Sequence, residues 1–313
     1  MFALHILVFA ILSLRTVLAA PASLWSGKRE PNGTTSIISQ STISNYFQRP
    51  ALFSRAAYCS ISQVATWTCG PSCDALPGVE VLASGGDNGE IPDFFIAHDT
   101  ATNTIVVAHQ GTDPFNLLSV LNDVEVTKSN LNSTLFPNAG SDIEVHDGFQ
   151  DTQGRTADLV LSTVLSALSS SGATEVAVTG HSLGAAVASL DAVMLKMHLP
   201  SDVSITATVF GLPRAGNQAW ADLVDSLLGS SFAHISNQLD PVPIVPAQFL
   251  GFQHPSGEAH ITYVASSGRA TIEACPGQEN EYCSDANSLS DFNILNHLGP
   301  YFNGISFGTW ACW

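Results

Sequence analysis

Apolar runs of β-strand length alternate with segments of helical periodicity over most of the chain. Two neighbouring runs, residues 93–97 and 104–108, predict adjacent strands joined by a turn at 99–103. Further strands are predicted at 175–179, 205–210 and 232–236. Apolar residues at helical spacing predict helices at 156–169, 183–198 and near 218–228. This alternation predicts an α/β fold with a central, mostly parallel sheet and helices on both of its faces.

The N-terminus indicates export from the cell. Residues 2–14 form an almost unbroken apolar run that is too short to span a bilayer, and Ala19 and Ala20 supply small residues for a cleavage site. A dibasic pair, Lys28-Arg29, offers a second processing site. The predicted segments are a signal peptide at 1–19, a propeptide at 20–29 and a single domain at 30–313. An N-terminal core helix is the alternative. Since no second apolar run is long enough for a transmembrane anchor, we expect a secreted, extracellular protein.

The charge balance limits the partners. The chain holds 27 acidic residues against 10 Lys plus Arg, a formal net charge of −17. Such a chain repels phosphate backbones, which argues against nucleic acid as a partner. A neutral oil surface or an uncharged ester remains compatible with it. Asn32 and Asn132 each begin a triplet of the N-glycosylation form.

Six cysteines in a secreted chain predict three disulfides, among fifteen possible pairings. Joining the two closest pairs first predicts the set Cys69–Cys73, Cys275–Cys283 and Cys59–Cys312. The last bridge would tie the start of the domain to its end. A metal site is the alternative, but the cysteines lack the paired Cys or His clusters of zinc sites.

Gly180-His181-Ser182-Leu183-Gly184 lies between the strand predicted at 175–179 and the helix predicted at 183–198. At such a tight strand-to-helix turn, glycines two residues on either side of the serine relieve collisions and expose its hydroxyl. Ser182 is therefore the predicted nucleophile of an esterase with an α/β-hydrolase-like fold. A serine in an ordinary turn is the alternative.

A serine nucleophile needs a base and a carboxylate to orient that base, in the chain order Ser, acid, His. Asp240 is the predicted acid, because it follows the strand at 232–236 and precedes Pro241-Val242-Pro243. Three other carboxylates lie on predicted helices and are interpreted as solvated: Asp191, Asp222 and Asp225. His297, near the chain end that Cys312 would anchor, is the favoured base. His254 and His260, flanking the turn of a hairpin predicted at 251–258, remain alternatives on the residues alone.

The oxyanion of the tetrahedral intermediate needs preorganised donors. The N–H of Leu183, at the start of the helix, is one predicted donor, and Thr112, which follows Gly111 after the strand at 104–108, is the other. The next segment is apolar and predicts a lid that opens at an oil–water interface. Its apolar residues are Phe115, Leu117, Leu118, Val120 and Leu121. A plain turn at 111–112 and an ordinary buried helix after it are the alternatives.

Taken in this order, these motifs resemble the filamentous-fungal class 3 lipase family, which also contains feruloyl esterases. The residues that carry the resemblance are 56–59, Gly111-Thr112, 146–149, 179–185, 211–217, 240–243 and 297–302. The resemblance implies the triad Ser182, Asp240 and His297, the oxyanion donors Thr112 and Leu183, and the Cys59–Cys312 disulfide. It implies hydrolysis without a metal or other cofactor. It also implies a mixed sheet, with antiparallel strands from the N-terminal part.

Two departures from the family concern the substrate. Gln110-Gly111 stands where family lipases often have Arg-Gly, and the lid holds Leu or Asn where they often have Trp. The Cys275–Cys283 loop and the ending Ala311-Cys312-Trp313 are similar to features of feruloyl esterases. The apolar lid favours a triacylglycerol lipase acting on lipid at an interface. A feruloyl or other small-ester esterase is the alternative.

Overall fold

The computed structural model describes residues 33–87, 89–111 and 127–312. The predicted signal peptide, propeptide and Asn32 lie outside these ranges, as do Thr112 and the predicted lid. Within the described ranges, no helix is both long and apolar enough to cross a membrane.

The centre of the molecule is a nine-stranded sheet in the order β1-β11-β10-β9-β8-β7-β4-β3-β2. Its strands are β1 (Ser36–Ile37), β2 (Val79–Gly85), β3 (Phe94–Asp99), β4 (Thr104–His109), β7 (Glu175–His181), β8 (Ser204–Phe210), β9 (Phe232–Asn237), β10 (Glu258–Val264) and β11 (Ala270–Cys275). The five central strands, from β4 to β10, pair in parallel. The strands at both edges pair antiparallel. The mixed sheet implied by the family resemblance is therefore present, although antiparallel strands come from the C-terminal part as well.

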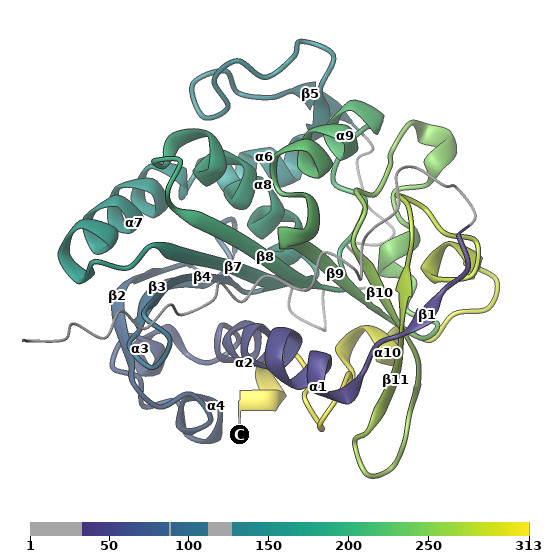
Figure 1. Ribbon diagram of the computed structural model, residues 1–313, viewed down its shortest axis with the longest axis horizontal. Coiled ribbons are helices and arrows are strands. Elements are labelled where there is room, and N and C mark those ends of the chain that lie inside the picture. The colour runs from purple at the N-terminus through teal and green to yellow at the C-terminus, as the bar shows by residue number, and fades with distance from the viewer. Residues whose placement is uncertain (1–32, 88, 112–126, 313) are drawn as a thin grey trace, which may run out of the picture.

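Helices cover both faces of the sheet (Figure 1). On one face lie α6 (Asp147–Gly154), α7 (Ala157–Ser171), α8 (Leu183–His198) and α9 (Gln218–Leu227). On the other lie α1 (Gln40–Thr42), a π-helical turn η2 (Ile43–Phe47), α2 (Gln48–Ala56), α3 (Ile61–Val64), α4 (Pro71–Asp74) and α10 (Ile294–Leu298). Two short strands, β5 (Lys128–Asn130) and β6 (Glu144–His146), form a separate antiparallel pair. The 3₁₀ turns are η3 (Gly229–Ser231), η4 (Val242–Ile244), η5 (Gln248–Leu250), η6 (Ser284–Ala286) and η7 (Thr309–Cys312).

The core lies in layers on the two faces of this sheet. One layer joins the sheet to α8, whose residues from Gly184 to Leu195 are all buried. The second contains Phe47, Phe210 and Tyr301, so it ties the first helices to the chain end. Because apolar side chains fill both faces, α8 and the central strands are held rigidly at the carboxyl ends of the strands, where α/β enzymes place their sites.

The three disulfides have the predicted pairing: Cys59–Cys312, Cys69–Cys73 and Cys275–Cys283. The first closes a loop with a sequence separation of 253 residues and joins the end of the chain to the segment after α2. The hairpin predicted at 251–258 is wrong, because β10 begins at Glu258 and pairs in parallel with β9. The hairpin in this part of the chain is formed by β10 and β11.

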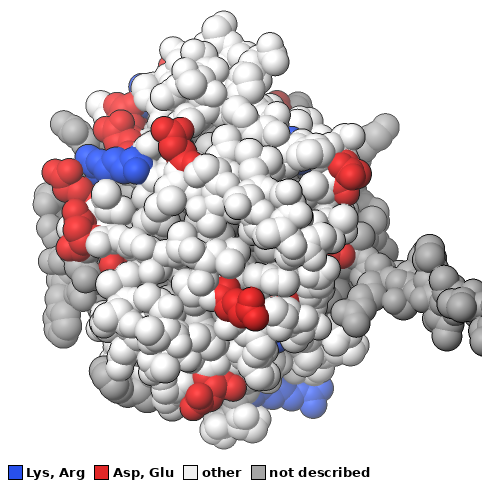
Figure 2. Space-filling model, turned by 90° about the vertical axis from the view of Figure 1, so that its left-hand side faces the viewer, with Lys and Arg blue, Asp and Glu red and all other residues white. Residues whose placement is uncertain are grey.

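Charged side chains are few on the face seen in Figure 2. Several carboxylates gather beside a basic group at the upper left, and the other charged groups stand apart among broad uncharged areas. The basic groups of the described residues on this face therefore form no stripe of the kind that binds nucleic acid.

Candidate active site

Ser182 occupies the sharp turn between β7 and α8. Its backbone has φ 60° and ψ −127°, a conformation that L-residues rarely adopt, and its N–H donates to Phe210 O at 2.9 Å. A Cβ added at Gly180 would lie 2.2 Å from Gly184 O, and one at Gly184 would lie 2.4 Å from Gln110 O. Side chains at these two positions would therefore force the turn apart, which is the reason for the Gly-x-Ser-x-Gly spacing.

Asp240 and His297 meet although 57 residues separate them. Asp240 lies in the turn after β9, and His297 lies on α10; neither side chain is exposed to solvent. His297 Nδ1 lies 2.8 Å from Asp240 Oδ2, while Val242 N–H donates to Asp240 Oδ1 at 2.9 Å. The carboxylate thus has a partner for each oxygen. It fixes the imidazole with Nδ1 as the donor, which leaves the lone pair on Nε2.

His297 Nε2 is buried and has no hydrogen-bond partner within the described part of the chain. An imidazole held by a carboxylate at Nδ1 and open at Nε2 is suited to take a proton from a serine hydroxyl.

His181 links the turn at Ser182 to His297. Its Nε2 donates to the backbone oxygen of His297 at 2.8 Å, so its Nδ1 accepts from the Tyr58 hydroxyl at 2.5 Å. Burial, with a further contribution from the charge of His297, lowers the pKa of His181 well below its usual value. His181 is therefore a neutral ring that braces α10 against β7.

The two alternative bases lie elsewhere. His254 Nε2 donates to Pro243 O at 2.8 Å, and His260 Nδ1 contacts Ser236 Oγ at 2.8 Å. Burial lowers the pKa of both side chains. The carboxylate of Asp240 is already engaged by His297 and Val242, so the geometry favours His297 over both.

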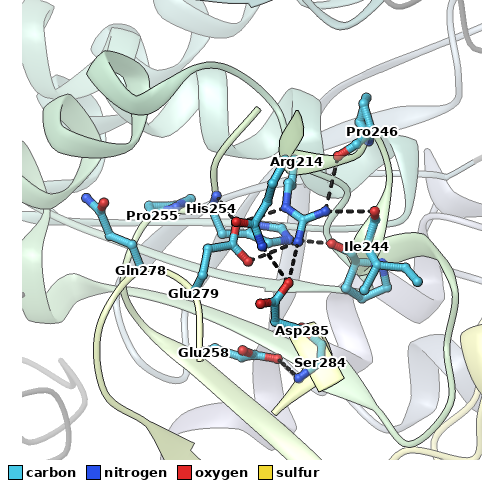
Figure 3. Close-up of polar contacts among 12 residues, drawn as sticks. Arg214, Ile244, Pro246, His254, Pro255, Glu258, Gln278, Glu279, Ser284 and Asp285 are labelled. Atoms are coloured by element: carbon cyan, nitrogen blue, oxygen red, sulfur yellow. Dashed lines mark hydrogen bonds and ion pairs between the residues drawn. The ribbon is translucent and has the colours of Figure 1, made fainter. Parts of the chain in front are cut away.

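Arg214 holds the segment that follows Asp240 (Figure 3). Its Nη1 donates to Ile244 O at 2.7 Å and to Pro246 O at 3.1 Å. The rest of the guanidinium forms a two-pronged pair with Glu279 and a further ion pair with Asp285 at 3.0 Å. Burial and the charge of Glu279 raise the pKa of Asp285. Arg214 therefore clamps the loop after Asp240 to the loop closed by the Cys275–Cys283 disulfide. From the sequence, Arg214 was noted only as part of the family motif at 211–217, with no predicted role of its own.

Of the two predicted oxyanion donors, the structure describes Leu183 but not Thr112. Leu183 is the first residue of α8, so its N–H has no acceptor within the helix and lies at the positive end of a 16-residue helix. The strand that leads to Thr112 is held at Gln110, whose N–H donates to Asp93 O at 2.8 Å and whose Oε1 accepts from Asp93 N at 2.9 Å. Thr112 itself and the lid residues lie outside the described ranges.

The interpretation of Asp191 as a solvated helix residue is wrong. Its carboxylate is fully buried, contacts His109 Nε2 at 2.8 Å and accepts from Gln153 Nε2 at 2.8 Å. The error arose because α8 is buried on every side, so no face of it is reserved for water. Asp222 and Asp225 are partly exposed on α9, as expected.

Several large apolar side chains are exposed close to Asp240 and His297 along the chain, and the sequence prediction missed them. We call this set the acid-loop patch: Leu239, Phe249, Leu289, Phe292 and Leu295. Asn293 N–H donates to Leu239 O at 2.9 Å, which places the segment before His297 against the residue before Asp240. Gln248 donates to Asp285 at 2.5 Å, which holds the η5 turn against the η6 turn, and Asn287, just after η6, donates to Asp240 O at 3.3 Å. Phe249 is 89% exposed.

Among the described residues, one group has side chains of the types that bind metals, with their ligand atoms within 4.8 Å of one another: Glu258, Cys275 and Cys283. Both cysteines are engaged in their disulfide, so they offer no thiolate. Glu258 bonds Ser236 Oγ and Ser284 N–H instead.

The chain matches the family model of class 3 lipases over residues 106–250. Among curated proteins it is 30% identical over 231 residues to the secreted mono- and diacylglycerol lipase LIP2 of Malassezia restricta, covering 74% of this chain and 71% of that protein. It is 33% identical over 260 residues to the secreted mono- and diacylglycerol lipase LIP4 of the same organism, covering 80% and 84% of the two chains.

Solved structures show the same fold. Lipase II from Rhizopus niveus superposes with a TM-score of 0.77 at 25% identity, covering 90% of this chain and all of that one. Lip2 lipase from Yarrowia lipolytica superposes with a TM-score of 0.74 at 27% identity, covering 88% and 99%. A third neighbour, a triacylglycerol lipase whose catalytic centre is a serine-protease triad, has a TM-score of 0.76 at 26% identity, covering 90% and 100%. The chain belongs to the class 3 lipase family and has its α/β-hydrolase fold.

Proposed function

We propose that the protein is a secreted lipase that hydrolyses acylglycerol esters, with Ser182 as nucleophile, His297 as base and Asp240 as the acid that orients it. The observation that carries the proposal is the buried Asp240–His297 pair, with Nε2 of His297 left open, beside the strained turn at Ser182. The secreted acylglycerol lipases among its relatives and the predicted signal peptide support both the substrate class and the extracellular location.

The reaction follows from these positions. His297 Nε2 takes the proton of Ser182 Oγ as the oxygen attacks the ester carbonyl, and Asp240 stabilises the imidazolium through Nδ1. The N–H of Leu183, with Thr112 as the predicted second donor, receives the negative charge on the carbonyl oxygen. Collapse breaks the ester bond, and His297 returns the proton to the departing glyceride oxygen. Water, deprotonated by His297, then releases the fatty acid and restores Ser182.

The acid-loop patch extends the proposal to the lipid surface. Exposed apolar side chains next to the acid and base would lie on an oil droplet when the site faces it, whereas a net charge of −17 opposes binding to anionic membranes. We propose a neutral lipid surface as the physiological partner, with the segment from Phe115 to Leu121 as a lid.

Labelling with an alkyl phosphonate tests the nucleophile. One phosphonyl group on Ser182, found by peptide mass spectrometry, is expected together with complete loss of hydrolysis. Parallel assays on emulsified tri-, di- and monoacylglycerols and on a soluble feruloyl ester test the substrate. Faster turnover of the feruloyl ester, with no gain from an interface, would establish the esterase alternative.

A further inference from the structure

We propose that Asp191 is a positioning residue for catalysis, which acts through His109 to hold the strand before Thr112 at a fixed distance from α8. The inference rests on the proposed function. His109 is the last residue of β4, and Asp191 lies in the middle of α8. Their contact, 2.8 Å from Nε2 to Oδ2, is shielded from water because the two side chains are 4% and 0% exposed.

Both carboxylate oxygens of Asp191 are occupied. Oδ2 meets His109, and Oδ1 accepts from Gln153 of α6 at 2.8 Å. The His109 ring also stacks on Phe94 of β3, with ring centroids 5.8 Å apart. The imidazole therefore has one orientation, set by a helix on one side and a neighbouring strand on the other.

Stability alone does not explain a buried His–Asp pair at this position. The surrounding residues of α8 are small or aliphatic, and an apolar pair of similar volume would fill the space without the desolvation cost of a carboxylate. What a buried polar pair adds is a defined geometry, since its hydrogen bonds fail if either element slides. The role of the pair therefore depends on which two elements it joins.

The pair connects the two elements that carry the predicted oxyanion donors. Helix α8 begins with Leu183, directly after Ser182, and β4 leads through Gln110 and Gly111 towards Thr112. The two elements are close at their ends, since a Cβ at Gly184 would lie 2.6 Å from His109 O. On the sheet side the same loop is tied at Gln110 by Asp93. On the helix side, Asp191 holds His109, the residue before Gln110.

Oxyanion donors act only when they meet the developing charge at hydrogen-bond distance, and an error of about 1 Å costs on the order of a hundredfold in rate. Weakening the tie between β4 and α8 should therefore lower the rate of the chemical step. It should have little effect on binding of the ground-state ester.

The test is Asp191→Asn in the full-length protein, because asparagine keeps the shape and removes the charge. With a soluble short-chain ester we expect kcat to fall about 10- to 100-fold while KM stays within about twofold. A trifluoromethyl ketone, whose serine hemiketal carries the oxyanion, should lose affinity by the same factor.

Asp99→Asn is the matched control. Asp99 is 1% exposed and pairs with Arg49, but it lies at the end of β3 that is remote from Ser182. We expect both variants to lower Tm and only Asp191→Asn to lower kcat and ketone affinity. Equal kcat and ketone affinity for Asp191→Asn and the unmodified enzyme would overturn the inference. If Asp191→Asn does not fold, His109→Phe, which keeps a ring against Phe94 but removes the donor towards Asp191, is expected to show the same fall in kcat and ketone affinity. Lack of hydrolysis by the unmodified enzyme would contradict the proposed function instead.

Discussion

Asp240 Oδ2 accepts a hydrogen bond from Nδ1 of His297 at 2.8 Å, and Val242 N–H occupies the other carboxylate oxygen at 2.9 Å. Because the backbone N–H can only donate, an amide at position 240 would turn its oxygen to Val242 and its NH₂ to the imidazole. His297 would then accept at Nδ1 and carry its proton on Nε2, the wrong tautomer for a base.

Asp240→Asn is therefore expected to lower kcat by about 10³- to 10⁴-fold, with Tm changed by only a few degrees. The two measurements are kcat on a soluble ester and Tm from thermal unfolding. Asp225→Asn on α9, where the carboxylate bonds Ser256, should leave kcat within about twofold. Retention of more than a tenth of the activity in Asp240→Asn would exclude the assigned role.

Buried histidines predict a loss of stability in weak acid. Burial lowers the pKa of four of them in the folded protein: His181, His234, His254 and His260. The unfolded chain binds a proton at each below about pH 6.5, whereas the folded protein does not until the pH is lower still. The free energy of unfolding therefore falls as the pH drops below about 6.5, by about 1.4 kcal/mol per pH unit for each proton taken up.

Denaturant unfolding between pH 8 and pH 5 measures this slope. His260→Gln, which can keep a contact to Ser236 Oγ, should make the slope shallower. A slope that is the same in His260→Gln and in the unmodified protein would show that this histidine is not the source.

Asp93 has the opposite effect on how stability depends on pH. Burial raises its pKa to about 6, and its Oδ1 has no hydrogen-bond partner among the described residues. A raised pKa means that the folded protein holds the proton more tightly than the unfolded chain does. The contribution of Asp93 to stability is therefore present below about pH 3.8 and is lost as the pH rises through about 6.

We expect Asp93→Asn to raise Tm at pH 8, where the native carboxylate is charged and buried, and to leave Tm nearly unchanged at pH 4. Thermal unfolding at the two pH values checks this difference. The N–H of residue 93 still bonds Gln110 Oε1 in the variant, so activity should persist. A lower Tm at pH 8 would contradict the prediction.

Local patterns predicted the parts of this molecule that local interactions determine. Helix α8 spans the predicted range, because its apolar run has Ser182 before it and Pro200 after it. The five strands predicted from β-rich runs are all present, as β3, β4, β7, β8 and β9. The region after Asp240 was harder, since residues 238–257 form irregular turns that are held by distant partners, above all Arg214. No sequence period signals such contacts, so the turns before β10 were mistaken for a hairpin at 251–258.

The buried carboxylate of Asp191 escaped prediction for a related reason. In an amphipathic helix a charged residue marks the face towards water, but α8 is apolar all round and offers no such face. The partner of Asp191 lies 82 residues earlier, on β4. The sequence contains both residues, and only the tertiary fold brings them together.

The acid-loop patch predicts a division between activity at an interface and activity in solution. Phe249 is almost fully exposed and therefore contributes little to folding, yet transfer of such a side chain into lipid gains about 1.5–3 kcal/mol. Phe249→Ser and Leu295→Ser are each expected to weaken adsorption to neutral lipid droplets about tenfold.

Hydrolysis of emulsified triacylglycerol should fall with adsorption, while hydrolysis of a soluble short-chain ester should stay within about twofold. Leu165→Ser is the matched control, because Leu165 is also an exposed leucine, at 42%, and lies on α7, which is on the opposite side of the molecule from α10 in Figure 1. Its substitution should change neither activity. Droplet flotation gives adsorption directly, and equal losses on the emulsion and on the soluble ester would show that the patch acts on the catalytic site and not on lipid.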